Sequence, residues 1–423
     1  MSSRIPGFYK LSPAKRLDKI AEQIDLGEEE KDILGGNGGF SVKQADQMIE
    51  NVIGYLPIPL GIAANFKVNG KDVFIPMATE EPSVVAAASH AAKLAYESGG
   101  FITSYTGSIM IGQIQVTDVK DPYGAMARVH ENKEEIIKLC NKQDPTLVSL
   151  GGGMKDIHVR IVPTNSEEMI LIHLLVDTRD AMGANAVNTM AEAVTPLIEK
   201  ITQGSVVLRI LSNLADERIT RARAIFENPF EGDKVAMDKF YKAAQLAIYD
   251  PYRATTHNKG IMNGISAVVT ATGNDTRAVE AGVHAYASKS GQYRSLTRWE
   301  IGKDNKIIGT IELPLAVGMV GGATQSHPVA KLATKIMGVQ SAEQLAGVIA
   351  SVGLAQNFAA IRALASEGIQ QGHMKLHARN LAVLAGAKED QIDEVVNIAA
   401  KHESYQFHEM EKIVKSLNTN RKR

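Results

Sequence analysis

Apolar residues alternate with polar ones in the middle of the chain, and this alternation predicts β-strands there. Four strands are predicted, at residues 113–119, 157–161, 169–176 and 205–211. Helical spacing of apolar residues predicts two helices between them, at 132–142 and 180–201. The resulting order of strand, helix, strand, strand, helix and strand is typical of a split βαββαβ, or ferredoxin-like, unit.

The segments on either side of this unit are predicted to be mainly helical. Helices are expected to begin at Ser12 and Ser41, because serine is a favoured N-cap and proline follows Ser12. The alanine-rich helix at 84–97 has small residues on all sides, so we expect it to be the buried central helix. Residues 299–313 are predicted to form a hairpin, and residues 410–417 give the last helix one apolar face.

Together these elements predict an α+β protein of three parts. The large domain is expected to be helical around its central helix and to comprise residues 1–108 and 214–371. The small ferredoxin-like βαββαβ domain would be inserted between them, at residues 109–213. Residues 372–423 are expected to form a mobile, helical C-terminal flap.

Composition and charge exclude several classes of protein. The net charge of −1 gives no reason to expect binding to nucleic acid or to an anionic membrane. The single cysteine, Cys140, lies in a predicted helix and is expected to be structural. We find no signal peptide and no run of about 18 apolar residues, so no membrane span is expected. A soluble, cytoplasmic protein is predicted.

Lys259 and Asp275 lie in glycine-containing segments, DPYRATTHNKGIMNG (250–264) and ATGNDT (271–276), which we interpret as turns. A lysine and an aspartate held together near apolar residues can polarise a carbonyl group and handle its protons. Each residue also has a simpler interpretation. Lys259 could be a surface charge, and Asp275 could only close an Asx-turn.

Two further segments carry chemistry of the same kind. Glu81 precedes Pro82, which favours an extended conformation at Glu81, just before the alanine-rich helix; a solvated acidic cap is the alternative interpretation. In Asp180-Ala-Met-Gly-Ala-Asn185, Asp180 can cap the long helix that follows. The free N–H groups of that helix start suit a pyrophosphate, although a capped helix alone would look the same.

Neither a Rossmann site nor a metal site is predicted. The glycine pairs at 36–38 and 151–153 do not complete the G-x-G-x-x-G pattern, so any dinucleotide site would be a non-Rossmann one. His373 and His377 stand four residues apart and could share one helical face, but a third ligand is not evident and H-E-x-x-H is missing. We therefore expect no metal.

Taken together, these segments resemble the 3-hydroxy-3-methylglutaryl-coenzyme A (HMG-CoA) reductases of the soluble prokaryotic class (class II), which lack a membrane anchor. The resemblance extends from residues 50–54 to residues 377–380, nearly the whole chain. The motifs that carry it are EEPS (80–83), DAMGAN (180–185), DPYR (250–253), HNKG (257–260), GND (273–275) and GHM (372–374).

The resemblance implies a reaction and four catalytic residues. HMG-CoA would be reduced by two hydrides, through bound mevaldehyde, to mevalonate and coenzyme A. Lys259 would stabilise negative charge on the reacting oxygen, and a protonated Glu81 would donate a proton to it. Asp275 would bridge Lys259 and Glu81. His373 would protonate the leaving coenzyme A thiolate.

The resemblance also implies the residues that bind substrate and cofactor. The hydroxymethylglutaryl portion would be held by a group of five polar residues, Ser83, Asn213, Arg253, Asn263 and Gln356. The dinucleotide would be held by a second group, Asp144, Asp180, Met182, Gly183 and Asn185. A carboxylate at Asp144 can accept from a ribose 2′-hydroxyl but repels a 2′-phosphate, so NADH is expected to be preferred over NADPH.

The family resemblance implies a homodimer with shared active sites, and a higher oligomer would be compatible with it. In that arrangement Glu81 is expected to lie across the subunit interface from Lys259. Because two cofactor molecules act in turn, the segment from about Gly372 is expected to close and open as a flap. The alternatives are another NAD-dependent reductase of an acyl-CoA thioester or aldehyde, and a non-catalytic CoA-binding dimer. The direction of the reaction in the cell is left open.

Overall fold

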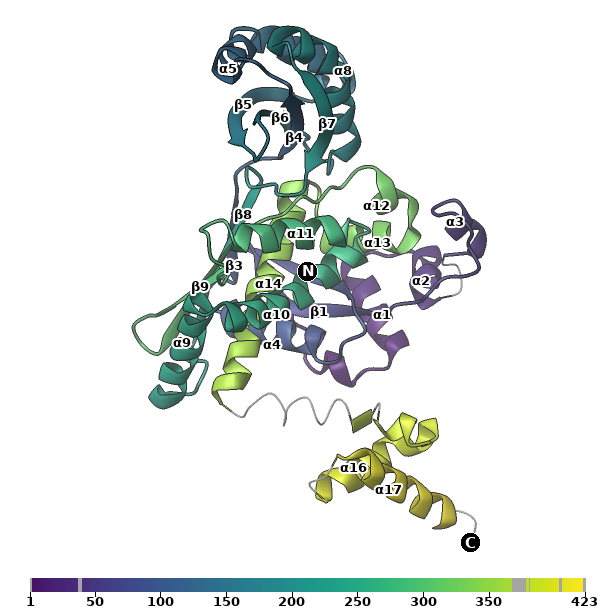
Figure 1. Cartoon of the computed structure of the whole chain (residues 1–423). Helices are drawn as coiled ribbons and strands as arrows, with labels where there is room; N and C mark the ends of the chain where they lie inside the picture. Colours follow the sequence, from purple (N-terminus) through teal and green to yellow (C-terminus); the bar gives the residue numbers. More distant parts are fainter. Residues whose placement is uncertain (1, 37–39, 367–377, 380, 403–404, 421–423) are drawn as a thin grey trace.

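The computed structural model describes residues 2–36, 40–366, 378–379, 381–402 and 405–420. Within them the chain forms two β-sheets, each with its own helices (Figure 1). The fold is α+β, as the sequence predicts. The four-stranded sheet lies at the top of Figure 1, and the six-stranded sheet and most of the helices lie below it.

The six-stranded sheet is mixed and is built from strands that are far apart in the sequence. Its order is β2-β1-β3-β8-β10-β9, and only the β1–β3 pair is parallel. Its strands are β1 (Leu60–Val68), β2 (Lys71–Ala78), β3 (Phe101–Tyr105), β8 (Ile219–Glu227), β9 (Thr297–Ile301) and β10 (Lys306–Pro314). The predicted hairpin is β9–β10, which turns through Asp304 and Asn305, both with φ of 57°.

The four-stranded sheet has ferredoxin-like connectivity. Its strands are β4 (Ile109–Thr117), β5 (Gly153–Pro163), β6 (Glu168–Asp177) and β7 (Ser205–Ser212). They are ordered β5-β6-β4-β7 and every neighbouring pair is antiparallel. The helices of this part are α5 (Pro122–Glu131), α6 (Lys133–Asn141), α7 (Pro145–Ser149) and α8 (Ala184–Thr202). The sequence patterns predict α6 and α8 but miss α5 and α7.

Most of the remaining helices surround the six-stranded sheet. They are η1 (Phe8–Lys10), α1 (Pro13–Ile24), α2 (Glu28–Gly35), α3 (Val42–Asp46), α4 (Val84–Tyr96), α9 (Lys234–Tyr249), α10 (Pro251–Ala271), α11 (Thr276–Ala287), α12 (Gly322–Ser326), α13 (Pro328–Met337) and α14 (Ala342–Ala365). The predicted caps are present, because the hydroxyls of Ser12 and Ser41 accept from backbone N–H groups of α1 and α3.

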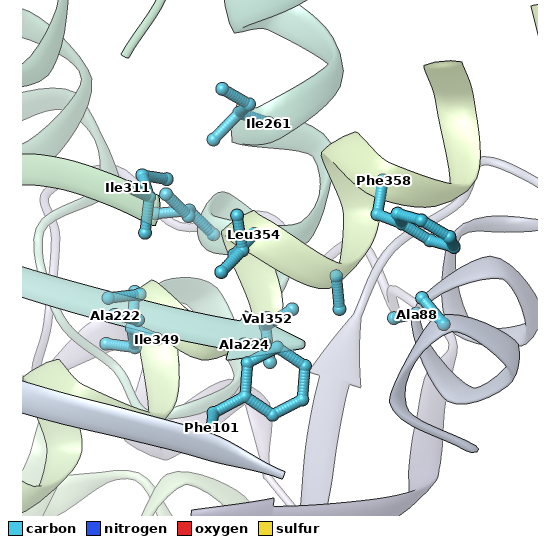
Figure 2. Packing of buried hydrophobic residues seen from close by; sticks show 14 of the residues in the cluster. Ala88, Phe101, Ala222, Ala224, Ile261, Ile311, Ile349, Val352, Leu354 and Phe358 are labelled. Carbon is cyan, nitrogen blue, oxygen red and sulfur yellow. The ribbon is translucent and has the colours of Figure 1, made fainter. Parts of the chain in front are cut away.

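The central helix is α14 and not the alanine-rich helix that the sequence suggests. Seventeen of its 24 residues are buried, including Leu354 and Phe358. Figure 2 shows these two side chains packed with Phe101 of β3, Ile261 of α10 and Ile311 of β10. In contrast, α4 buries only one face, which includes Ala88 (0% exposed), and its opposite face is open.

By length and composition alone, α14 could cross a membrane, the one such helix in the described part of the chain. However, 72% of its most apolar window is buried inside the protein. Its apolar residues therefore form the core between α4, α10 and the sheet. The sequence patterns miss this helix because an all-round apolar helix has no polar face to reveal its period.

In the sequence, the strands of the four-stranded sheet lie between β3 and β8, which are neighbouring strands of the six-stranded sheet. β3 precedes the insertion, β8 follows it, and the two strands pair antiparallel from Phe101–Ala224 to Tyr105–Thr220. Thr106 continues this pairing, because its N–H donates to the carbonyl of Ile219 at 3.0 Å. The chain thus leaves and re-enters the large sheet at one place.

The C-terminal part contains a small cluster of helices. They are η2 (Glu389–Gln391), α16 (Ile392–Lys401) and α17 (Phe407–Asn420). Met410, Ile413 and Val414 are buried in a cluster with Val395 and Ala399, which confirms the predicted apolar face of the last helix.

Candidate active site

Lys259 lies in the middle of α10 and not in a turn, so the prediction of a turn at residues 250–264 is wrong. Asp250 caps this 21-residue helix by accepting from the N–H of Arg253 at 2.7 Å, and Pro251 occupies its first turn. Neither of its glycines reverses the chain, and Gly264 serves close packing. A Cβ at Gly264 would lie 3.0 Å from Val352 and 3.1 Å from Gln356, both on α14.

Glu81 meets Lys259 and Asn263 of the same chain. The Lys259 ammonium lies 3.0 Å from Glu81 Oε2, and the Asn263 amide donates to Glu81 Oε1 at 3.2 Å. Lys259 and Asn263 are four residues apart, so they share one face of α10. The expected placement of Glu81 and Lys259 on opposite sides of a subunit interface is therefore wrong, since one chain forms the pair by itself.

The backbone of Glu81 is held by Thr79, which the sequence patterns did not single out. Its hydroxyl accepts from the Glu81 N–H at 3.2 Å, at the end of β2. The only sequence feature that could have indicated Thr79 is its position as a polar residue directly after a buried strand. About a third of the Glu81 side chain (37%) and 63% of the Lys259 side chain are exposed, so this pair faces open space where a substrate can reach it.

Asp275 does not bridge Lys259 and Glu81 in this structure. It caps α11 by accepting from the N–H of Ala278 at 3.0 Å, and its other contact is with Arg277, 3.6 Å away. Gly273 before it has φ of 65°, so the expected turn is present here. The neighbouring Asn274 was missed by the sequence analysis; its side chain accepts from the N–H of Gly318 at 2.7 Å.

Two of the expected substrate-binding residues hold polar atoms without a partner. Ser83 Oγ and Gln356 Oε1 are buried and have no hydrogen-bond partner in the described part of the chain. Ser83 also has φ of 77°, a left-handed conformation that is costly for a residue with a Cβ. A polar ligand that bonded these atoms would remove the cost of leaving them unpaired.

The other two expected substrate residues lie at the ends of secondary structure elements. Arg253 is partly buried in the first turn of α10, and this burial lowers the pKa of its guanidinium from the ordinary value. Asn213 follows β7 and is exposed. Its backbone carbonyl touches α11, where a Cβ at Gly282 would come within 2.4 Å of it. Asn213 is thereby placed beside the helix that Asp275 caps.

Asp180 does not cap α8, contrary to the sequence expectation. Its carboxylate accepts from the N–H of Ala342 at 2.8 Å, at the start of α14. The N-cap of α8 is Gly183, with φ of 96° and no side-chain hydrogen bond to the helix. A Cβ at Gly183 would lie 2.2 Å from the side chain of Thr178, so only glycine fits there. The first N–H groups of α8 consequently have no side-chain cap.

The remaining cofactor residues lie on either side of this turn. Met182 and Asn185 flank Gly183. Asp144 caps α7 by accepting from the N–H of Leu147 at 2.8 Å. The α7 helix adjoins the turn before α8, because a Cβ at Gly152 would touch Leu147 at 2.6 Å and Arg179 at 2.9 Å. α7 and the turn before α8 therefore lie close together at Gly152.

His373 and His377 lie outside the described residues, so the structure says nothing of their predicted roles. Within the described residues, no group of three or more histidine, cysteine, aspartate or glutamate side chains could hold a metal ion.

Cys140 is buried, and burial raises the pKa of its thiol to about 12, in keeping with a structural side chain.

Comparison with known proteins identifies the family of this chain. Residues 12–378 match the family model of hydroxymethylglutaryl-coenzyme A reductase. The chain is 57% identical over 402 residues to the 3-hydroxy-3-methylglutaryl-coenzyme A reductase of Archaeoglobus fulgidus, covering 95% of this chain and 92% of that protein. This chain belongs to the hydroxymethylglutaryl-coenzyme A reductase family.

Solved structures of HMG-CoA reductases share the fold as well as the sequence. The Streptococcus pneumoniae enzyme is 40% identical and superposes with a TM-score of 0.83, covering 97% of this chain and 99% of its own. A class II structure of the same enzyme, bound to NADPH, has a TM-score of 0.82 and covers 85% of this chain and 99% of its own. The protein is thus an oxidoreductase that reduces HMG-CoA to mevalonate, and the rival functions are not favoured.

Proposed function

We propose that Glu81, Lys259 and Asn263 form the centre at which the thioester carbonyl of HMG-CoA is reduced. Their contacts at 3.0 and 3.2 Å within one chain are the observation that supports this assignment best. Asp275 and His373 complete the proposed catalytic set. Asp275 would reach the Glu81–Lys259 pair after substrate binding, and His373 would be brought to it by the flap.

Each side chain has a separate role in the proposed mechanism. A bound reduced nicotinamide supplies one hydride to the carbonyl carbon in each of the two steps. Lys259 stabilises the negative charge that develops on the carbonyl oxygen in both steps. In the first step the oxyanion re-forms the C=O bond as the C–S bond breaks, and in the second step a protonated Glu81 gives the aldehyde oxygen its proton. Asn263 holds the Glu81 carboxyl group on the side facing Lys259. His373 donates a proton to the sulfur of coenzyme A as the thiolate leaves.

The hydroxymethylglutaryl portion is proposed to bind between α4, α10 and α14. Ser83 precedes α4 and Gln356 belongs to α14, and both hold a buried polar atom that a substrate oxygen or hydroxyl can satisfy. Arg253, on α10, would pair with the free carboxylate of the substrate. Asn213 would supply a further amide from the end of β7.

The start of α8 is proposed to hold the dinucleotide phosphates. Its N-cap has no side chain, and the positive end of the helix dipole favours an anion at that place. Asp180, Met182, Gly183 and Asn185 would surround the pyrophosphate. The contact of Asp180 with α14 fixes the turn on the substrate side of the molecule.

Asp144 is proposed to favour NADH over NADPH. It caps α7, the helix whose Leu147 lies near Arg179 of the turn that leads into α8. A carboxylate there accepts from the 2′-hydroxyl of NADH and repels the 2′-phosphate of NADPH. Replacing Asp144 with alanine is expected to lower the ratio of kcat/KM for NADH to that for NADPH by tenfold or more. An unchanged ratio would contradict this assignment.

The protein is proposed to act as a cytoplasmic homodimer with shared active sites. The segment before β1 exposes large apolar side chains that a monomer would leave in water, namely Ile49 (64%), Ile53 (102%), Tyr55 (55%), Leu56 (87%) and Ile58 (48%). Because one chain supplies the Glu81–Lys259 pair, sharing would have to involve other residues of the partner. Residues 1–108 with 214–371, 109–213 and 372–423 are proposed as the three structural parts. Each has a main buried cluster, and the cluster of 109–213 also takes in Ala215 and Ala316 of the large part.

One assay tests the proposed chemistry directly. Oxidation of NADH and of NADPH is followed by absorbance with HMG-CoA as substrate, for the native protein and for Lys259→Met. The substitution is expected to lower kcat by roughly 10²- to 10³-fold, because it removes the charge that stabilises the oxyanion. Lys242→Met is the matched control, since Lys242 is an exposed lysine on α9 with an ion pair to Asp238. Equal activity in both variants would overturn the role of Lys259.

A further inference from the structure

Arg218 is fully buried at the point where the chain returns to the large sheet. Its side chain is 0% exposed, and it immediately precedes β8. The guanidinium donates four hydrogen bonds, to Tyr105 Oη (2.7 Å), Thr178 Oγ1 (3.1 Å), the Ala181 carbonyl (3.1 Å) and the Val317 carbonyl (2.6 Å). Within the described residues it makes no ion pair with a carboxylate, so its role differs from that of an ordinary salt bridge.

The four acceptors belong to three separate segments. Tyr105 ends β3 on the way into the small sheet. Thr178 and Ala181 belong to the turn between β6 and α8, whose proposed role is to hold the dinucleotide. Val317 precedes Gly318, whose N–H donates to the side chain of Asn274, the neighbour of Asp275. One guanidinium therefore joins three places: the end of β3 at Tyr105, where the chain enters the small sheet; the turn between β6 and α8; and the segment after β10 that bonds Asn274, next to Asp275.

The cofactor turn and the Val317–Val320 segment are in close contact beside this guanidinium. The N–H of Met319 donates to the Asp180 carbonyl at 2.7 Å. A Cβ at Gly318 would come within 2.5 Å of the Met182 nitrogen, so the two backbones touch. Ala181 and Val320 also form an isolated parallel bridge. Movement of either segment would therefore displace the other.

We propose that Arg218 is a positioning residue that fixes the cofactor turn, residues 178–183, against the substrate-binding part of the protein. This inference rests on the proposed role of the α8 N-terminus in binding the dinucleotide. A planar guanidinium can reach four acceptors in different directions at once, whereas a lysine ammonium cannot match that geometry. Loss of the guanidinium removes the side-chain donor of the buried Val317 carbonyl and the link from Tyr105 and Val317 to the turn, so the turn is freer to shift.

The test compares Arg218→Met, Arg218→Lys and Arg223→Met. Arg223 is an exposed arginine on the same strand, β8, and serves as the control. Binding of NADH and of HMG-CoA is measured separately by titration calorimetry, together with KM for each. Arg218→Met is expected to raise Kd and KM for NADH at least tenfold while Kd for HMG-CoA changes less than twofold. Arg218→Lys should fall between it and the native protein.

The opposite results would overturn the inference. If NADH affinity is unchanged in Arg218→Met, or if NADH and HMG-CoA affinities fall in parallel, Arg218 is not a specific positioning residue. Should Arg218→Met fail to fold, Thr178→Val replaces it, because valine keeps the shape but removes the hydroxyl, which accepts from the guanidinium and donates to the carbonyls of Ser108 and Ala181. Thr178→Ser keeps the hydroxyl and is its control. Thr178→Val should raise Kd for NADH several-fold and Thr178→Ser should not; equal effects would contradict the proposal.

Asn185→Ala separates a failure of this inference from a failure of the proposed cofactor site. If Asn185→Ala weakens NADH binding and the Arg218 variants do not, only the positioning role is wrong. If Asn185→Ala leaves NADH binding unchanged, the α8 N-terminus is not the dinucleotide site, and the inference fails with it.

Discussion

At the scale of single residues, His257 shows how α10, the helix that carries Lys259, is held on the side away from Lys259. It lies two residues before Lys259, so the two side chains project from different faces of α10. The ring is 2% exposed, and its Nε2 lies 2.9 Å from Thr297 Oγ1 and 2.8 Å from Ser295 Oγ. Burial, and then the nearby Arg253, lower the pKa of His257 to about 3, so it remains neutral while the enzyme works.

This lowered pKa predicts a loss of stability in acid. The pKa of His257 is 6.5 in the unfolded chain and about 3 in the native protein. Between these pH values the unfolded chain binds a proton at His257 and the native protein does not. The free energy of unfolding should fall by up to ~1.4 kcal/mol per pH unit over that window, and should not change above it. Urea unfolding of the native protein and of His257→Gln at pH 7.5 and pH 5.0 checks this.

The glutamine variant cannot take up the proton, so its stability should fall less between the two pH values. The expected difference is on the order of 2 kcal/mol, and other titrating groups cancel because both proteins share them. Parallel pH dependence in the two proteins would show that His257 does not resist protonation.

The family resemblance pointed to Glu81, Lys259 and Asn263 and led us to expect Glu81 near Lys259, but it placed the two in different subunits, whereas one chain forms the contact. Motif resemblance supplied the residue types, and helical spacing explains why Lys259 and Asn263 share a face once α10 is known. The partner of Asp180 could not be predicted, because the N–H of Ala342 belongs to a helix 162 residues away. That Ser83 Oγ and Gln356 Oε1 are buried without a hydrogen-bond partner could not be predicted from the sequence either, since burial depends on the packed structure.

At the scale of elements, the contact between α10 and α14 sets the geometry of the proposed substrate site. α10 carries Lys259 and Asn263, and α14 carries Gln356. Their close approach depends on Gly264, whose missing side chain leaves room for Val352. The glycines of α10 suggested a turn because the same residue that permits chain reversal also permits helices to touch.

Matched substitutions at the two glycines of α10 test this contact. Gly264→Val is expected to destabilise the protein by roughly 1–3 kcal/mol more than Gly260→Val, because only Gly264 faces α14. A Cβ at Gly260 would meet nothing within 4 Å, so that variant measures the helix propensity alone. Urea unfolding of both variants gives the difference. An equal loss of unfolding free energy in both variants would mean that α14 moves aside for the larger side chain without a loss of stability.

Elements with a clear period were the most predictable ones. The four strands of the small sheet and the helices α6 and α8 follow directly from their apolar spacing. The six-stranded sheet could not be assembled from sequence, because its strands come from residues 60–105 and 219–314 and pair over long distances. The central helix was misassigned because α14 is apolar all round, and α4 merely has small residues.

At the scale of the whole molecule, the location of the Glu81–Lys259 pair predicts the behaviour of mixed dimers. If the protein forms dimers, combining a Glu81→Gln subunit with a Lys259→Met subunit should leave both sites defective, because each chain supplies its own pair. The kcat of a heterodimer purified with two different tags is the measurement. Recovery of about half the native activity would instead show that the pair forms between subunits.

The junction between the insertion and the six-stranded sheet has a consequence for how the insertion can change. Thr106 and Ile219 are hydrogen-bonded neighbours in the six-stranded sheet. The more than one hundred residues between them therefore connect β3 and β8 in the same way as the loop of a hairpin. A loop whose ends are already adjacent costs little entropy to lengthen. The insertion could therefore be lengthened or shortened at little cost in entropy while β3 and β8 remain paired.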